Sequence, residues 1–162
     1  MQRLFAVLAL LPALLFAQIP ELVQQYRQRI GGAVDELNVV VRNFDEDSRR
    51  SGYDRAGALG VMKKNPERLV REQGQRMEEY VTLLDRLNAQ QAVLANGATF
   101  GAVIVIVFDY DQQVMSRAWD TYTAAFPTNV TGFGFAIIGW VAGYAALLLL
   151  GFIARSCVSA RA

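Results

Sequence analysis

Histidine is absent from this sequence, and cysteine occurs once, as Cys157. Without histidine the chain lacks the commonest general base, the commonest metal ligand and the usual pH switch. A single cysteine cannot form an internal disulfide, and it cannot build a zinc site of clustered thiolates. We therefore expect no metal and no other cofactor.

An excess of charge of either sign is also lacking, because 16 basic and 15 acidic residues leave a formal net charge of +1. Proteins that bind nucleic acid usually carry a basic patch, so nucleic acid is not an expected partner. A phosphate-binding loop with its lysine is missing, and any serine nucleophile would lack a histidine base. These absences predict a protein that is not an enzyme.

Hydrophobic residues, in contrast, make up 53% of the chain, and the longest apolar run extends over residues 130–154. These 25 positions contain no charged residue. As a helix they would extend over about 37 Å, which is enough to cross the core of a bilayer with some tilt. We predict a transmembrane helix over residues 127–154, followed by a short tail, 155–162.

A second apolar run, Leu4 to Ala17, follows the basic residue Arg3. This pattern fits either a cleaved secretory signal or a membrane anchor that is retained. Leu15 is bulky at a position where a cleavage site after Ala17 would favour a small residue, so we favour retention. We predict a transmembrane helix over residues 1–19, kinked at a proline.

Small residues recur in both apolar runs at spacings of three to four, which is typical of faces on which membrane helices pack. The residues are Ala9, Ala13 and Ala17 in the first run, and Gly132, Ala136, Gly139 and Gly143 in the second. These faces predict pairing of the two spans, or of two protomers. Glycine is also simply tolerated in membrane helices, so the pattern alone does not decide.

Positive charges flank the two spans at the chain ends, with Arg3 before the first and Arg155 and Arg161 after the second. Positive residues favour the cytoplasmic side. We therefore expect both termini in the cytoplasm of a bacterium and the central region, residues 20–126, in the periplasm.

The central region begins with a heptad pattern, which predicts a long helix ending between Asp47 and Gly52. Its two series are Ile19, Tyr26, Ala33 and Val40, and Val23, Ile30, Leu37 and Phe44. Gly31 and Gly32 weaken this helix, and they indicate a close approach of a partner there.

A second long helix is predicted to begin near Pro66 and to end near Gly97, with a short helix before it over 54–64. Its apolar series are Val70, Met77 and Leu84, and Tyr80, Leu87 and Leu94. The two long helices should form an antiparallel hairpin whose seam is its core.

Residues 98–108 contain five consecutive β-branched residues, which favour a strand. Because no other segment resembles a strand that could pair with it, we favour a helix, either buried or at the membrane surface. Residues 109–126 predict an amphipathic helix in which Trp119, Tyr122 and Phe126 form an aromatic collar at the bilayer interface.

Two segments resemble a known family. The run QIPELVQQYRQRIGGAVDEL, residues 18–37, resembles the opening of a family of proteobacterial inner-membrane proteins classed as a domain of unknown function, and AFPTNVTGFGFAIIGWVAGY, residues 125–144, resembles its closing segment. The resemblance implies a membrane protein, without any activity or catalytic residue to transfer. The motif residues are Gln24, Gln25, Tyr26, Gly31, Gly32, Asp35 and Glu36.

The sequence thus predicts an all-α membrane protein, with two transmembrane helices flanking a coiled-coil-like helical hairpin outside the membrane. Its expected partners are membrane lipid and either further copies of itself or other membrane proteins. We expect a scaffold, assembly factor or accessory subunit. An oligomeric channel or transport component is the alternative, although neither span carries an ionisable residue in its interior.

Overall fold

The computed structural model describes residues 2–122 and 130–159 of the 162-residue chain, with side chains described as far as Ile153. Every secondary-structure element in these ranges is a helix. The elements are α1 (Gln2–Leu8), α2 (Leu10–Ala17), α3 (Ile19–Arg50), α4 (Arg55–Lys63), α5 (Arg68–Leu94), α6 (Phe100–Phe108), α7 (Gln112–Asp120) and α8 (Val130–Ser159). Two long apolar helical stretches at the chain ends flank a helical middle, as predicted.

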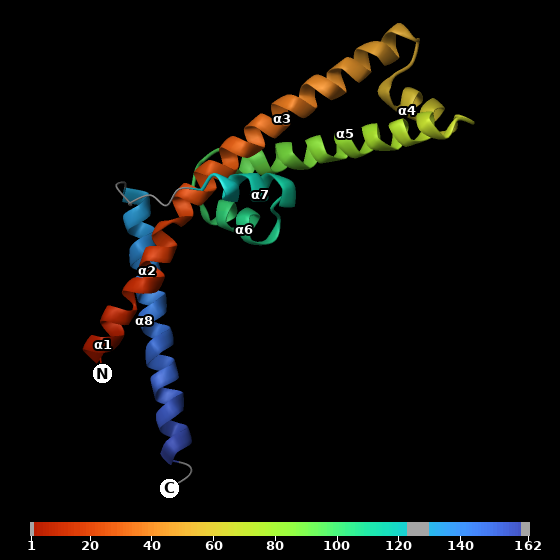
Figure 1. Cartoon of the computed structure of the whole chain (residues 1–162). Helices are drawn as coiled ribbons and strands as arrows, with labels where there is room; N and C mark the ends of the chain where they lie inside the picture. Colours follow the sequence, from red (N-terminus) through yellow and green to blue (C-terminus); the bar gives the residue numbers. More distant parts are fainter. Residues whose placement is uncertain (1, 123–129, 160–162) are drawn as a thin grey trace.

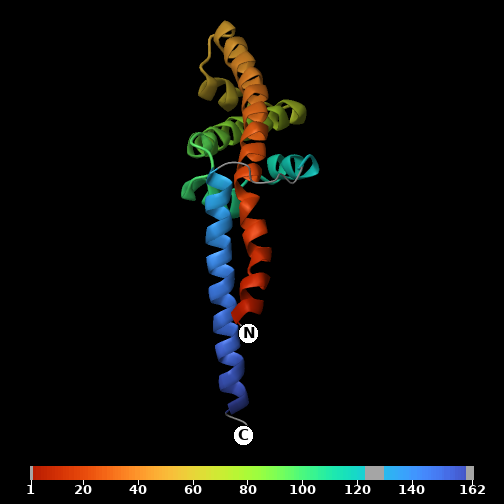
Figure 2. The ribbon, with the colours of Figure 1, turned by 90° about the vertical axis from the view of Figure 1, so that its left-hand side faces the viewer.

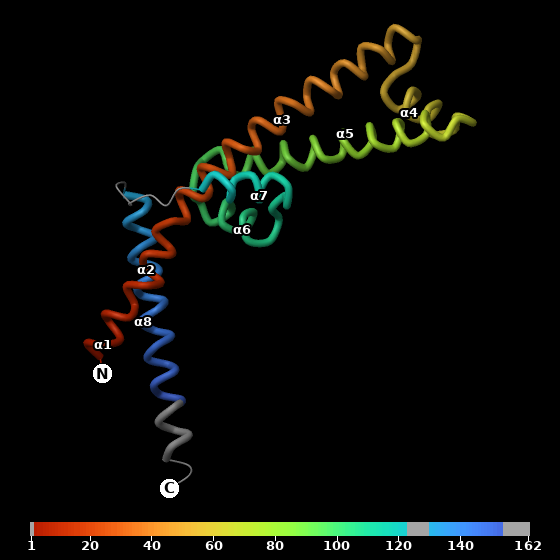
Figure 3. The backbone as a smooth tube through the Cα atoms, viewed as in Figure 1, coloured from red at the N-terminus to blue at the C-terminus, as the bar shows by residue number. Residues whose placement is uncertain are grey.

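Helices α2 and α8 lie side by side, and the hairpin of α3 and α5 projects away from them as an arm (Figures 1 and 2). The backbone passes from α1 through α2 into α3 with only local breaks, so one nearly continuous helical strut connects the N-terminal run to the arm (Figure 3). The first break follows Leu8, whose carbonyl would normally accept the amide hydrogen that Pro12 lacks.

Two helices of the described chain are long and apolar enough to cross a membrane, one within Gln2–Arg50 and one over Val130–Ile153. The apolar side chains of α8 point mostly outward, and Ile137, for example, is 64% exposed. A core helix of a soluble protein would bury such residues, whereas lipid can cover them. The exposure of α8 is therefore consistent with a span.

The hairpin has the predicted connections. Helix α3 ends at Arg50, where Gly52 adopts a positive φ of 84° that favours glycine, and α5 ends at Leu94 before Gly97, with φ of 77°. Between them, the Asp54 side chain caps α4 by accepting a hydrogen bond from the Gly57 amide at 2.7 Å. The interpretation of residues 98–108 as a helix is confirmed by α6.

The core of the arm is concentrated at its base, where α3 and α5 meet α6 and α7. Its buried members are Val23, Tyr26, Ile30, Val34, Val41, Leu84, Leu87, Leu94, Ala102, Val105, Val114 and Ala118. The heptad prediction is thus correct for the first turns of α3 and the last turns of α5.

Farther along α3 the heptad prediction is correct only in part. Ala33 and Leu37 are half-buried and pack against the core. Val40, in contrast, is 39% exposed, and Val34 and Val41, which belong to neither predicted series, are buried. The reason is that α7 packs against α3 in this region, so the seam is not closed by α5 alone. The predicted helix over 109–126 is also shorter in the structure, since α7 ends at Asp120, and Phe126 lies outside the described residues.

The expected close approach at the paired glycines does not occur within the described chain. A Cβ atom at Gly32 would meet nothing within 4 Å, and one at Gly31 would lie 3.7 Å from Gln91 Nε2, an ordinary contact. A close approach of two helices of the arm occurs instead at Gly74, where a Cβ would lie 2.8 Å from the Cβ of Met62 on α4. Its missing side chain lets α4 lie against α5.

We expect Gly32→Ala to raise the thermal stability of the arm, because it removes a backbone-entropy cost of about 1 kcal/mol without creating a clash. The melting temperature of the full chain in mild detergent, followed by circular dichroism, measures this gain. Gly74→Ala is the matched control, and it should lower the melting temperature. A loss on Gly32→Ala would contradict the open space that the structure shows at this position.

Candidate functional site

The small-residue faces of the two apolar runs meet within the chain. Ala9, Ala13 and Ala17 are buried, and a Cβ at Gly139 would lie 2.7 Å from both the Pro12 carbonyl oxygen and the Phe16 Cβ. Of the other predicted small residues of α8, Gly132 is buried, and Ala136 and Gly143 are half-buried. A Cβ at Gly143 would clash with the Pro12 ring.

The kinked part of the first run, at Pro12, therefore packs directly against Gly139 and Gly143 of α8. The indole nitrogen of Trp140 donates a hydrogen bond of 3.0 Å to the Ala6 carbonyl, in the turn before the kink. Trp140 also stacks on Tyr144, with ring centroids 5.4 Å apart. Since an unpaired N–H is costly in an apolar environment, this bond favours one register of the two helices.

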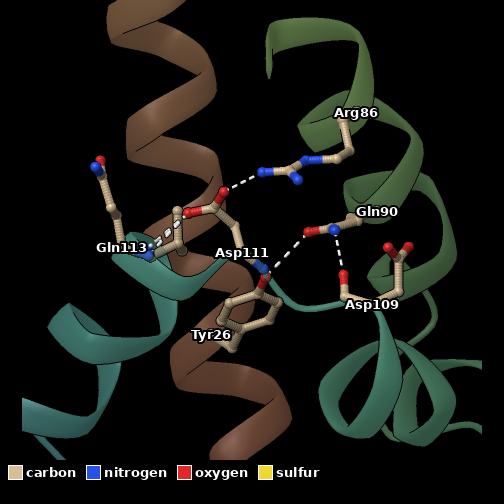
Figure 4. Close-up of polar contacts among 7 residues, drawn as sticks. Tyr26, Arg86, Gln90, Asp109, Asp111 and Gln113 are labelled. Atoms are coloured by element: carbon tan, nitrogen blue, oxygen red, sulfur yellow. Dashed lines mark hydrogen bonds and ion pairs between the residues drawn. The ribbon is translucent and has the colours of Figure 1, made fainter. Parts of the chain in front are cut away.

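A buried polar cluster holds the base of the arm together (Figure 4). Its centre is Tyr26, which is 0% exposed and comes from α3. The Tyr26 hydroxyl donates to Gln90 Oε1 of α5 at 3.0 Å and accepts from the Asp111 amide at 2.7 Å. Gln90 Nε2 in turn donates to the Asp109 carbonyl. Three separate parts of the chain are therefore joined at one hydroxyl group.

Asp111 completes the cluster and starts α7. Its Oδ1 accepts from the amides of Gln113 at 3.0 Å and Val114 at 3.1 Å, which is the geometry of a helix N-cap. Its Oδ2 forms an ion pair with Arg86 of α5 (Figure 4). One carboxylate thus fixes the first turn of α7 and its position against α5.

Burial raises the pKa of the Tyr26 hydroxyl from its ordinary value of 10.0 to about 12. Tyr26 therefore remains protonated throughout the physiological range and serves as a hydrogen-bonding group rather than as an acid or base. Because the folded pKa lies above the unfolded one, its contribution to stability is complete below pH 10 and decreases as the pH rises through about 12.

We expect the free energy of unfolding to fall by roughly 2–3 kcal/mol between pH 10 and pH 12 through this group, from 1.36 kcal/mol per pKa unit. Urea unfolding of the full chain in detergent at several pH values measures the decrease. Tyr26→Phe, which cannot ionise at this position, is the control and should lose less stability over the same interval. Identical pH profiles would contradict the assignment.

A groove of about 330 Å³ lies beside this cluster, between α3, α5 and α7. Its apolar lining includes Leu37, Val40, Leu83, Leu87 and Val114. Glu36 of α3 and Arg117 of α7 also line it, and both are exposed. Leu37 and Val40, which were predicted to lie in the seam, therefore contribute to an apolar groove whose lining also includes the acidic Glu36 and the basic Arg117.

The residues of the predicted motif have different positions. Gln24, Gly32, Asp35 and Glu36 are exposed, while Gln25 and Gly31 are half-buried and Tyr26 is fully buried. Gln25 Nε2 donates to Glu21 Oε1 at 2.9 Å. Only Tyr26 enters the polar cluster, and only Glu36 lines the groove. The motif therefore does not form one site.

Sequence reasoning missed Arg86, Gln90 and Asp111. Gln90 lies on the buried face of α5 but is polar, so an apolar periodicity cannot identify it. Asp111 had a recognisable signal, because Asp is a preferred N-cap residue and Asp111 directly precedes α7, which begins at Gln112. No group of three or more acidic, histidine or cysteine side chains that could hold a metal ion occurs in the described part of the chain.

The fold therefore defines an all-helical protein in which two paired apolar helices carry a helical-hairpin arm. The chain belongs to the family described as "Protein of unknown function (DUF2937)", which it matches over residues 1–159. Searches of curated proteins and of solved structures find no match.

Proposed function

We propose that this chain is an integral membrane protein that acts through contacts with another membrane protein, as a scaffold, assembly factor or accessory subunit. The groove between α3, α5 and α7 carries this proposal. Its volume of about 330 Å³ is at the lower end of the range for small-molecule pockets, and it is bounded by helices. Such a groove suits the apolar side chains of a partner helix.

The charges beside the groove specify the partner further. A helix that binds here would place a basic side chain near Glu36 and an acidic one near Arg117. Neither residue has an ion pair within the described chain at 4.0 Å or less. The glycine face of α8, in contrast, already packs against Pro12 and Phe16 of the same chain. This packing favours the arm, rather than the spans, as the place of association.

The proposal is tested by introducing a photo-crosslinking amino acid at Val40 in the full chain in its native membrane. Val40 lines the groove. We expect a discrete adduct with one membrane protein, identified by mass spectrometry, and we expect Leu83→Arg to abolish it because a charge would then occupy the apolar floor.

Arg42 is the matched labelling control. A helix turns by about 100° per residue, so Arg42 lies on the side of α3 opposite Ala33, which lines the groove. It is exposed. The same adduct from both positions, or an adduct from Val40 that survives Leu83→Arg, would overturn the groove as the binding site. An adduct at twice the mass of 17.9 kDa would assign the contact to a second copy instead.

We further propose that the membrane is the bacterial inner membrane, with both termini in the cytoplasm and the arm in the periplasm. The basic flanking residues Arg3, Arg155 and Arg161 support this orientation. A reporter that is active only in the periplasm should be active when fused after Gly57. Activity of a cytoplasmic reporter at the same position would reverse the orientation.

A further inference from the structure

Helix α6 has an apolar face that no other part of the described chain covers. Phe100 and Phe108 are each 82% exposed, and Val107 and Ile104 are 53% and 42% exposed. At 100° per residue these four positions occupy one sector of about 100°, which we call the α6 apolar face. Ala102 and Val105, on the other side of the helix, are buried in the core of the arm.

The α6 apolar face points away from α5, on the side toward which α8 extends. Helix α6 packs on α5 and α3 through its buried side. Figures 1 and 2 show α6 beneath α5, near the level at which α8 begins at Val130. Since the buried side faces α5, the exposed side faces the direction in which α8 extends. A membrane crossed by α8 would meet this face near the surface of the same leaflet.

The surrounding chemistry is that of a membrane interface. No charged residue occurs from Ala98 to Phe108. Trp119, 61% exposed, stacks on Tyr122 with ring centroids 5.3 Å apart. The Tyr122 hydroxyl donates to Gln18 Oε1 at 3.0 Å, directly after α2. Trp and Tyr are enriched where membrane helices leave the hydrocarbon core. The contact with Gln18 therefore places this aromatic pair at the end of the first span, where an interface is expected.

We infer that the α6 apolar face is inserted into the headgroup and acyl-chain boundary of the bilayer that the two spans cross. The occupant of this surface is thus lipid. Interfacial helices bury an apolar side in this way while their other side remains outside the hydrocarbon. Because α6 shares a core with α3 and α5, insertion would hold the arm at a fixed angle to the membrane. The inference rests on the membrane placement of the spans and not on the binding of a protein partner.

The test uses the purified full chain, with Cys157→Ser, in vesicles of phosphatidylethanolamine and phosphatidylglycerol at one protein per vesicle. A nitroxide label is attached to a cysteine at Val107, and its collisions with oxygen and with a water-soluble nickel complex are compared. A label at Ile138 of α8 serves as the lipid reference, and one at Arg76 of α5 as the aqueous reference. Both positions are exposed.

We expect the ratio of oxygen to nickel collisions at Val107 to be several-fold higher than at Arg76 and below that at Ile138, because Ile138 lies eight residues into α8 and therefore deeper in the bilayer. Phe100→Glu combined with Phe108→Glu should shift the Val107 label toward the aqueous value without loss of helical circular dichroism, because neither phenylalanine is in the core. An aqueous label at Val107 with a lipid-exposed label at Ile138 would overturn insertion of α6 alone. Aqueous labels at both positions would overturn the spans, and the membrane part of the proposed function with them.

Discussion

Replacing Tyr26 by alanine is expected to lower the free energy of unfolding of the arm by about 3–5 kcal/mol, the usual cost of truncating a buried aromatic side chain. Two effects combine in this variant. The ring leaves a cavity among α3, α5 and α7, and the Asp111 amide and Gln90 Oε1 lose their shared partner. Urea unfolding of the full chain in mild detergent, followed by circular dichroism, measures the loss.

Tyr26→Phe separates the two effects, because it keeps the ring and removes only the hydroxyl. It should cost about 1–3 kcal/mol for buried polar groups left without a partner. Tyr53→Ala is the matched control, since Tyr53 is 46% exposed and its truncation should change stability by less than about 0.5 kcal/mol. If Tyr26→Ala were as mild as Tyr53→Ala, the cluster would not hold the base of the arm.

Gly139→Leu is expected to separate the two apolar helices, at a cost of about 1–3 kcal/mol for overpacking a close contact. The reason is steric, since a Cβ there would lie 2.7 Å from the Pro12 carbonyl, which is part of the backbone and cannot rotate away. Gly134→Leu is the control on the same helix, because a Cβ at Gly134 meets nothing within 4 Å.

The separation is measured by crosslinking the N-terminal apolar run to the C-terminal part of α8, where the two lie in contact. Phe5→Cys and Gly151→Cys are introduced with Cys157→Ser, because Phe5 Cε2 lies 3.2 Å from the Cβ position of Gly151. A short bismaleimide should link them in high yield, in lower yield with Gly139→Leu, and in unchanged yield with Gly134→Leu. Equal loss in both leucine variants would indicate a general effect of bulk rather than the contact with Pro12.

The candidate groove shows where sequence reasoning fails for this chain. Leu37 and Val40 belong to a regular heptad series, and periodicity alone predicts that such residues are covered by a partner helix. The structure instead places α7 beside α3, so that these residues line a groove. Nothing in a local pattern reports that a third helix, about 70 residues later, occupies part of the seam.

The polar cluster was predictable only in part for a similar reason. Tyr26 was singled out by its position in the heptad and in the motif, but its hydroxyl partners come from residues 64 and 85 positions away. Hydrogen bonds over such separations leave no periodic signal in the sequence. Asp111 could have been recognised as an N-cap, although its pairing with Arg86 could not.

The sequence by itself determined the helical class, the two apolar runs, the hairpin with its short connecting helix and the small-residue faces. These features follow from local composition and from the 3.6-residue period of a helix, which act within a few turns. Only the tertiary structure decided that Gly139 and Gly143 pack against Pro12 and Phe16 of the same chain, that Tyr26 joins three segments, and that α6 leaves an apolar face exposed. The physical reason is that packing partners and the surfaces left over depend on contacts between distant segments, which form only when the whole chain is folded.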